Sequence, residues 1–495
     1  MHHCLSIPEI LVVILNYLRP PLNDEEGTPD CRSLISGPML TCKLFLEPAL
    51  DIIWESLDSF TPLVKLLPSD SDALRALSVA SQIFLQGTPL LPSLQSLRIA
   101  FDDYTEDPWS AQLILTKNLR KIVVDLPNTS NEIKLAHKMI LSSLGAMSPR
   151  IQYIRCQQLE GNVPSIRTCL WSGVCDMPNL RVAHFPDHAI ESTALSHLGS
   201  LPNLHTATLF VADMVYPLVG TFPALQRLSL FSKDWDHLIN FTQQGGMPTQ
   251  LTEFIATVRL PNNGLTGPQL QRLAVSLAER CSATLVKIDL HAPPPRLDPQ
   301  PPFEFATADI EPLLSCSSLQ HLSLRLRCST ASFDDGLLSS LAKALPKLRH
   351  LNLAAQDQYG GQIASKCTPV SLLHLAQHCP HLEWIGLVFA AENHAEWAGK
   401  QKGSKPAQMV KYLGVGGTAL LEGGCKPMAL LLSAAFPHLQ KIGHSRVHRD
   451  WQMESYQIEK AWEKVNDLYF FALQARMQER EWRVEEGPQT VHNNN

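Results

Sequence analysis

A short phrase of apolar positions recurs thirteen times along this chain. Each phrase has an apolar residue, two free positions, a second apolar residue, one free position and a third apolar residue, as in Leu225-Leu228-Leu230. Apolar residues that alternate with free positions are typical of a strand with one buried face. The segments between the phrases carry apolar residues at helical spacing, as in 269–277 and 336–345. The pattern therefore predicts a repeating unit of one short strand and one returning helix.

The distance between phrases indicates which repeat this is. The phrases begin at Leu94, Leu119, Ile151, Leu180, Leu204, Leu225, Leu251, Leu285, Leu319, Leu348, Leu382, Val410 and Leu439. Their first positions are 21 to 34 residues apart, which resembles the period of leucine-rich repeats. We predict an α/β fold, a curved solenoid with parallel strands on its concave face, and such a surface is suited to holding a partner.

The free positions of the phrases predict a binding surface. If the first, fourth and sixth positions point into the core, the third, fifth and seventh lie on the concave face. Aromatic and basic residues are frequent there, and our candidate target-binding residues are Phe210, Arg227, Phe231, Lys287, His321, Arg325, His350 and Trp384. Such residue types favour interface hot spots and an acidic target. The alternative is that they are ordinary surface residues of strands.

The position of two of these candidates predicts a contact. Phe210 and Phe231 both occupy the seventh position, in consecutive phrases. Side chains at the same position of neighbouring parallel strands lie side by side. We therefore expect the two phenylalanine rings to be neighbours, with the basic residues following on later strands.

The first sixty residues follow a different pattern. Ser6 and Glu9 have the spacing of a capping box, which predicts a helix that begins there and runs to Leu18. Its apolar face is extended by Val12, Val13 and Tyr17, so the helix needs a second surface to cover it. Further helical regions are expected from about Leu34 and up to Leu57.

Residues 5–57 resemble an F-box. The matching elements are Ile7-Pro8-Glu9-Ile10-Leu11, Cys42-Lys43-Leu44-Phe45 and Ile53-Trp54-Glu55-Ser56-Leu57. Together with the repeats behind it, this order is similar to the leucine-rich-repeat F-box proteins common in fungi. The alternative is that this segment only forms a helical cap on the first repeat.

The resemblance implies a function. Proteins of that family are substrate-recognition subunits of cullin-RING (SCF-type) ubiquitin ligases and perform no bond chemistry themselves. It implies that a Skp-type adaptor, and through it a cullin, binds the F-box, while the repeats bind a target protein. The adaptor-binding candidates are Ile7, Pro8, Ile10, Leu11, Ile14, Leu18 and Trp54. The competing interpretation is a leucine-rich-repeat scaffold or enzyme regulator, of GTPase-activating or inhibitor type, which would leave residues 5–57 without a purpose.

The chain is expected to have five parts. They are an F-box-like helical module at 1–60, a helical linker or solenoid cap at 61–90, the repeat solenoid at 91–446, a capping helix at 447–484 and a disordered tail at 485–495. The capping helix is predicted from the helical spacing of Ile458, Trp462, Val465 and Tyr469. A repeat array needs such a cap at its open end.

Composition narrows the classes of partner. The net charge of −6 gives no basic surface for DNA or RNA, so nucleic acid is not an expected partner. No apolar run approaches the ~18 residues of a membrane-spanning helix, so no membrane is expected either. Cysteines such as Cys281, Cys316 and Cys379 fall at predicted helix ends and form no Cys-x-x-Cys pair. That pattern favours a reducing compartment, the cytoplasm or the nucleus.

A search for catalytic motifs gives no candidate. We find no Gly-x-Ser-x-Gly, Walker, dinucleotide-binding or zinc-ligand pattern in the sequence. His374 and His378 are four residues apart on a predicted helix, but the surrounding leucines fit an ordinary repeat helix. We therefore predict no catalytic, cofactor-binding or metal-binding residues and a protein that is not an enzyme.

Overall fold

The computed structural model describes most of the chain from residue 91 onward. The described ranges are 91–100, 115–126, 135–158, 164–212, 221–244, 247–259, 265–292, 306–326, 333–353, 365–397, 405–444 and 452–485, with residue 399 and short pieces at 56–57, 303–304 and 328–329. The chain divides into two compact units. Unit 1 comprises Met1–Phe210 and Phe222–Ala224, and unit 2 comprises Val211–Thr221 and Leu225–Asn495.

Unit 1 alternates strands and helices along one parallel sheet. Its elements are β1 (Ser56–Leu57), β2 (Ser96–Ala100), β3 (Lys121–Leu126), α7 (Leu135–Met147), β4 (Tyr153–Gln158), α8 (Pro164–Cys175), β5 (Val182–Ala189), α9 (Ser192–Ser200) and β6 (Thr206–Val211). The strands pair in chain order from β1 to β6, each parallel to the next.

Unit 2 repeats the same arrangement more often. Its strands are β7 (Arg227–Ser232), β8 (Glu253–Val258), β9 (Lys287–His291), β11 (His321–Arg325), β13 (His350–Leu353), β14 (Trp384–Leu387), β15 (Tyr412–Gly416) and β16 (Lys441–His444), paired in this order and parallel. A separate two-stranded sheet joins β10 (Phe303–Glu304) to β12 (Cys328–Ser329).

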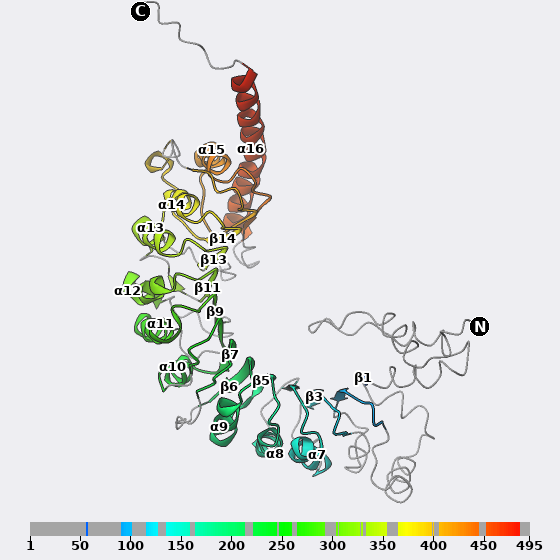
Figure 1. The fold of residues 1–495 in the computed structure, drawn as a ribbon. Coiled ribbons are helices and arrows are strands. Elements are labelled where there is room, and N and C mark those ends of the chain that lie inside the picture. The colour runs from blue at the N-terminus through cyan, green and yellow to red at the C-terminus, as the bar shows by residue number, and fades with distance from the viewer. Residues whose placement is uncertain are drawn as a thin grey trace, which may run out of the picture. The chain divides into compact units, whose positions relative to one another are not determined.

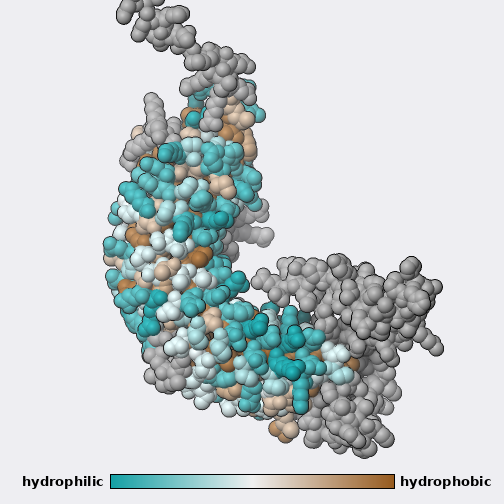
Figure 2. Space-filling model, viewed as in Figure 1, coloured by the Kyte–Doolittle hydropathy of each residue, from teal (hydrophilic) through white to brown (hydrophobic). Residues whose placement is uncertain are grey.

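The helices of unit 2 lie between its strands along the chain, and the last one follows them. They are α10 (Trp235–Gln243), α11 (Gly267–Cys281), α12 (Thr307–Ile310), α13 (Asp335–Ala344), α14 (Val370–His378), α15 (Cys425–Ala435) and α16 (Gln452–Glu485), with 3-10 helices at Glu311–Ser315, His394–Glu396 and Glu422–Gly424. Figure 1 shows strands β7 to β14 on one side of this unit and helices α10 to α15 on the other. The visible surface over helices α10 to α14 is mostly hydrophilic or neutral (Figure 2), so their apolar stripes face the sheet.

The strands coincide with the apolar phrases. Every one of the thirteen phrases contains one strand, and the mixed α/β fold with parallel strands is therefore confirmed. In β7, positions alternate between buried and accessible, and Leu225, Leu228 and Leu230 are at most 1% exposed. Each leucine buried in this way contributes about 2 kcal/mol relative to an exposed one.

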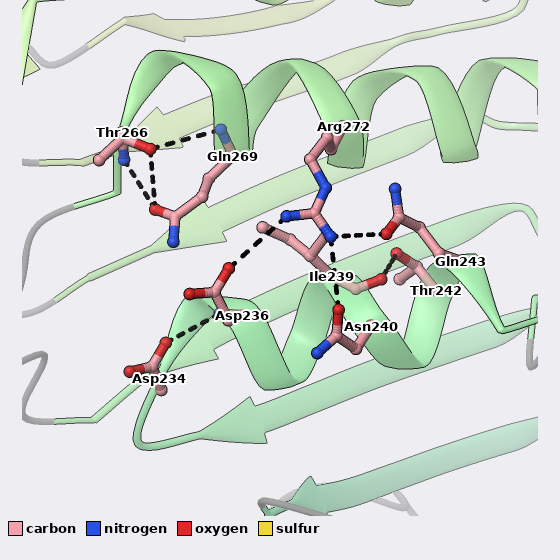
Figure 3. Close-up of polar contacts among 9 residues, drawn as sticks. All are labelled: Asp234, Asp236, Ile239, Asn240, Thr242, Gln243, Thr266, Gln269 and Arg272. Atoms are coloured by element: carbon pink, nitrogen blue, oxygen red, sulfur yellow. Dashed lines mark hydrogen bonds and ion pairs between the residues drawn. The ribbon is translucent and has the colours of Figure 1, made fainter. Parts of the chain in front are cut away.

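Polar side chains fix the helices to one another, as α10 and α11 illustrate (Figure 3). At the start of α11, the backbone N–H of Gln269 donates to the Thr266 hydroxyl. The backbone N–H of Thr266 donates to the side-chain oxygen of Gln269 at 3.0 Å. This is a capping box, and it satisfies two amides that the first helical turn leaves without partners. Arg272 on α11 then reaches α10, where it donates to Gln243 at 2.8 Å and lies 3.7 Å from Asp236.

Buried thiols connect successive repeats. The Cys281 thiol donates to the Pro248 carbonyl at 3.2 Å, and the Cys379 thiol donates to the Leu345 carbonyl at 3.6 Å. Both carbonyls belong to the residue three positions before a phrase. Burial raises the pKa of Cys281 to about 11 and that of Cys379 to about 12, so both remain protonated donors at neutral pH. These cysteines are structural.

Helix α16 takes the place of a further repeat behind α15. The Tyr469 hydroxyl donates to the Phe436 carbonyl at 2.8 Å, and Phe436 is again three positions before a phrase. The Trp462 indole N–H donates to the Thr418 carbonyl at 2.9 Å. Trp462 and Tyr469 are both buried, so the helix covers the last repeat with the residues that its helical spacing picks out.

One expected helix end is a strand. Ser56 and Leu57 were expected to end the third N-terminal helix, but they form β1 and pair with Ser96 and Leu97 of β2. An open edge of a parallel sheet has unpaired amides and carbonyls, and β1 satisfies those of β2. The adaptor-binding candidates Ile7, Pro8, Ile10, Leu11, Ile14, Leu18 and Trp54 lie outside the described residues.

Candidate protein-binding surface

The third positions of the phrases form a continuous row across the sheet of unit 2. Pairing in register aligns Arg227, Glu253, Lys287, His321, His350, Trp384, Tyr412 and Lys441 on successive strands. The fourth position of each phrase from β7 to β15 is buried in the core, so the third points to the opposite face of the sheet. This row therefore lies on the face away from the helices.

Four neighbouring members of the row stack their rings. We call His321, His350, Trp384 and Tyr412 the ring ladder. Ring centroids are 4.0 Å apart between His321 and His350, 4.2 Å between His350 and Trp384, and 5.2 Å between Trp384 and Tyr412, with planes within 11° of parallel. Parallel strands about 4.8 Å apart present rings at a stacking distance. All four residues are half-buried, so the ladder is a preformed and accessible feature.

Glycines make room for the last ring. A Cβ atom on Gly443 would overlap the hydroxyl oxygen of Tyr412 and lie 2.8 Å from its Cζ, and a Cβ on Gly414 would lie 3.3 Å from its Cε1. The Tyr412 ring therefore lies close over both glycines, which occupy fifth positions of their phrases. Gly414 and Gly416 belong to β15, and Gly416 has a φ of 54°. Glycine at position 414 is therefore explained by the close approach of a ring.

The fifth positions differ from the expected pattern beneath the histidine rings. In β7, β8 and β9 the third, fifth and seventh positions are accessible, as predicted. Ser323 on β11 and Asn352 on β13 are instead buried, each 2% exposed. The exposed surface here is therefore narrower than simple alternation predicts.

The two histidines of the ladder are neutral. Burial, and then the neighbouring His321, lower the pKa of His350 from 6.5 to about 4. Burial, and then Lys287, lower the pKa of His321 as well. At neutral pH these rings carry no charge, so the expected basic patch is here an uncharged row of rings.

Arginines of this face are neutralised by carboxylates. Arg325 Nη2 lies 3.0 Å and 3.1 Å from the two carboxylate oxygens of Asp289, whose side chain is 14% exposed. Arg227 pairs with Glu253 at 3.0 Å. By contrast, Lys287 has no ion pair within the described part of the chain. The uncompensated positive charge therefore comes from lysine.

The expected contact between the two phenylalanine candidates stays a prediction, but one of the two residues is buried. Phe210 belongs to unit 1 and is only 7% exposed. Phe231 belongs to unit 2, where the guanidinium of Arg259 lies 4.7 Å from its ring centroid. The seventh position of β6 is thus a core position. Our candidate set also omitted Tyr412 and Lys441, although both occupy third positions and the same rule would have included them.

Unit 1 has a different strand face. Lys121 Nζ lies 5.0 Å from the centroid of Tyr153, and the Tyr153 ring meets His184 at 58° and 5.6 Å. The His184 ring contacts the Thr208 hydroxyl at 2.8 Å through Nδ1. These rings are tilted against each other, and each has a polar contact of its own, Tyr153 with Lys121 and His184 with Thr208. Among the described residues, the stacked row is therefore a feature of unit 2.

The described residues offer no metal site. In that part of the chain no three His, Cys, Asp or Glu residues gather as a metal would require, and His374 and His378 are no exception. Likewise, none of the helices that the structure describes is long and apolar enough to cross a membrane.

Comparisons with known proteins show no family for this chain. No family model matches the chain, and no curated protein matches it. A chain in a crystal structure of the Rad7 and Elc1 complex from yeast is 13% identical, with 84% of this chain and 93% of that chain covered and a TM-score of 0.38. A likeness of this size supports no functional conclusion, so the argument rests on the residues of this chain.

Proposed function

We propose that this chain is a non-catalytic substrate-recognition subunit of an SCF-type ubiquitin ligase. Its N-terminal segment binds a Skp-type adaptor, which connects it to a cullin, and the strand face of unit 2 binds a target protein. The ring ladder is the observation that supports target binding. The F-box-like elements within residues 5–57 support the adaptor role.

The ring ladder has the properties of a protein-binding hot spot. Tryptophan and tyrosine are enriched where interface energy concentrates, and rigid rings lose little entropy on binding. Stacking holds Trp384 between His350 and Tyr412 before any partner arrives. A partner therefore does not have to order these side chains, which reduces the entropy loss on association.

In this function the chain contributes proximity. It holds the target near the ubiquitin-conjugating enzyme, which turns an encounter between two molecules into a reaction within one assembly. No residue of the chain needs to form or break a bond.

Separate substitutions test the two halves. Leu11→Asp with Ile14→Asp should abolish co-purification of the adaptor, because each places a charge in an apolar interface. The same variant should still capture the target. Trp384→Ala with Tyr412→Ala should lose the target and keep the adaptor.

Target capture is measured by cross-linking and mass spectrometry with ligase activity blocked. Wild-type adaptor binding by the Leu11 and Ile14 variant would refute the adaptor role. An unchanged target profile in the Trp384 and Tyr412 variant would refute the assigned surface.

A further inference from the structure

We propose that the ring ladder binds an extended acidic segment that crosses the strands of unit 2, with carboxylates near Lys287 at one end and Lys441 at the other. This inference rests on the proposed target-binding role of the same face and names the chemistry of the target. Three observations support the inference: the length of the third-position row, the charges along it, and the hydrogen-bond donors of its rings that have no acceptor among the described residues.

The dimensions fit a single extended chain. Lys287 on β9 and Lys441 on β16 are separated by five steps from strand to strand, through β11, β13, β14 and β15. At about 4.8 Å a step this distance is roughly 24 Å. An extended chain covers it with about seven residues. The ladder between the lysines is one ring wide on each strand, which suits a segment better than a broad domain surface.

The charges require acidic groups in the ligand. Strands β9, β11, β13, β14 and β15 contain one carboxylate, that of Asp289, and it is already paired with Arg325. Lys287 and Lys441 have no ion pair among the described residues. This surplus lies on a chain with a net charge of −6, so an acidic partner is steered to this face.

The middle of the segment meets ring edges. Stacked rings cover one another's faces, so their edges remain for contact, and an aromatic edge carries the positive side of the ring quadrupole. The Trp384 indole and the Tyr412 hydroxyl are donors that make no hydrogen bond to the described residues. Backbone carbonyls of an extended chain are matching acceptors. Recognition of the middle therefore depends on the backbone and allows many sequences, whereas the ends require carboxylates.

The spacing of the acids is the first test. Fluorescent peptides with two glutamates at each end, joined by Gly-Ser spacers of two, seven or twelve residues, are titrated with the full-length protein and followed by fluorescence anisotropy. The seven-residue spacer should bind at least about fivefold more tightly than the two-residue spacer, because it separates the two glutamate pairs by about the distance between the lysines. A peptide with lysine in place of glutamate should not bind. Equal affinity for the two- and seven-residue spacers would overturn the proposal.

Lysine variants test the same contact from the protein. Lys287→Gln with Lys441→Gln should weaken binding of the seven-residue peptide about fivefold to tenfold and reduce its salt dependence. The matched control is Lys343→Gln with Lys426→Gln, which removes the same charge from exposed positions on α13 and α15. Equal affinity losses in the two double variants would contradict specific binding at the ladder.

Ring variants separate this inference from the proposed function. Trp384→Ala should weaken the peptide tenfold or more, and Trp384→Phe should retain most of the affinity because it keeps a ring. Loss of the cellular target in Trp384→Ala, combined with no peptide binding by the wild type, would refute the acidic segment and leave target binding by this face in place. Peptide binding at the ladder, with a target profile unchanged by Trp384→Ala, would refute the proposed function alone.

Discussion

Gly443→Ala is the most direct perturbation of the ring ladder. The new Cβ would overlap the hydroxyl oxygen of Tyr412 and lie 2.8 Å from its Cζ, and a phenol ring cannot yield by bending. Tyr412 must therefore rotate away, which ends its stacking on Trp384 at 5.2 Å. Overpacking of this kind destabilises by about 1 to 3 kcal/mol, of which the lost stacking is about 1 kcal/mol. We expect unfolding free energy to fall by about 2 kcal/mol.

A matched glycine provides the control. Gly417 follows the same strand, β15, and a Cβ atom there would meet nothing within 4 Å. Gly417→Ala should be neutral or stabilise by a few tenths of a kcal/mol, because alanine restricts the unfolded chain. Urea denaturation followed by tryptophan fluorescence gives the free energy of unfolding for each variant.

A double-mutant cycle identifies the contact. When Tyr412→Ala has removed the ring, Gly443→Ala should no longer destabilise, so the coupling energy should equal nearly the whole effect. If Gly443→Ala is as harmless as Gly417→Ala, or if its effect persists without the Tyr412 ring, the described packing of the ladder is wrong.

Two further predictions concern the cap and the histidines. Tyr469→Phe removes the hydroxyl that donates to the Phe436 carbonyl and should lower the unfolding free energy by about 1 kcal/mol. Phe471→Leu, at a position that is 70% exposed, should not, and equal effects in urea denaturation would contradict the capping contact. The pKa of His350 is lowered to about 4 in the folded state, so the unfolded chain binds more protons between pH 6.5 and 4 and stability falls as pH falls through this window. His350→Phe should lose less stability than the wild type between pH 7 and pH 4, and identical pH profiles would refute the assigned protonation state.

Much of the fold follows from the order of residues. The apolar phrases located strands β2 to β9, β11 and β13 to β16, because alternation of buried and accessible positions is a local property of a strand. The same rule located the third-position row, and thereby Lys287, His321, His350 and Trp384. Helical spacing likewise selected Trp462 and Tyr469 as buried residues of α16.

The state of those residues required the tertiary structure. Whether His321 and His350 are charged depends on burial and on neighbours some thirty residues away, and a single phrase contains neither. The pairing of Arg325 with Asp289, 36 residues earlier, removed a cation that composition alone had counted as available. Phe210 was expected on the surface and is in the core, because alternation gives the face of a residue and not what covers it.

The sequence by itself determined a repeat protein, the positions of its strands and the row from which a binding surface is built, since these depend on periodicity along the chain. Only the tertiary structure decided that four of these side chains stack as one ladder, that glycines at 414 and 443 make room for the last ring, and that lysines rather than histidines supply the free positive charge. Stacking, close approach and desolvation all depend on distances between strands that are about thirty residues apart in the sequence, and those distances exist only once the sheet has formed.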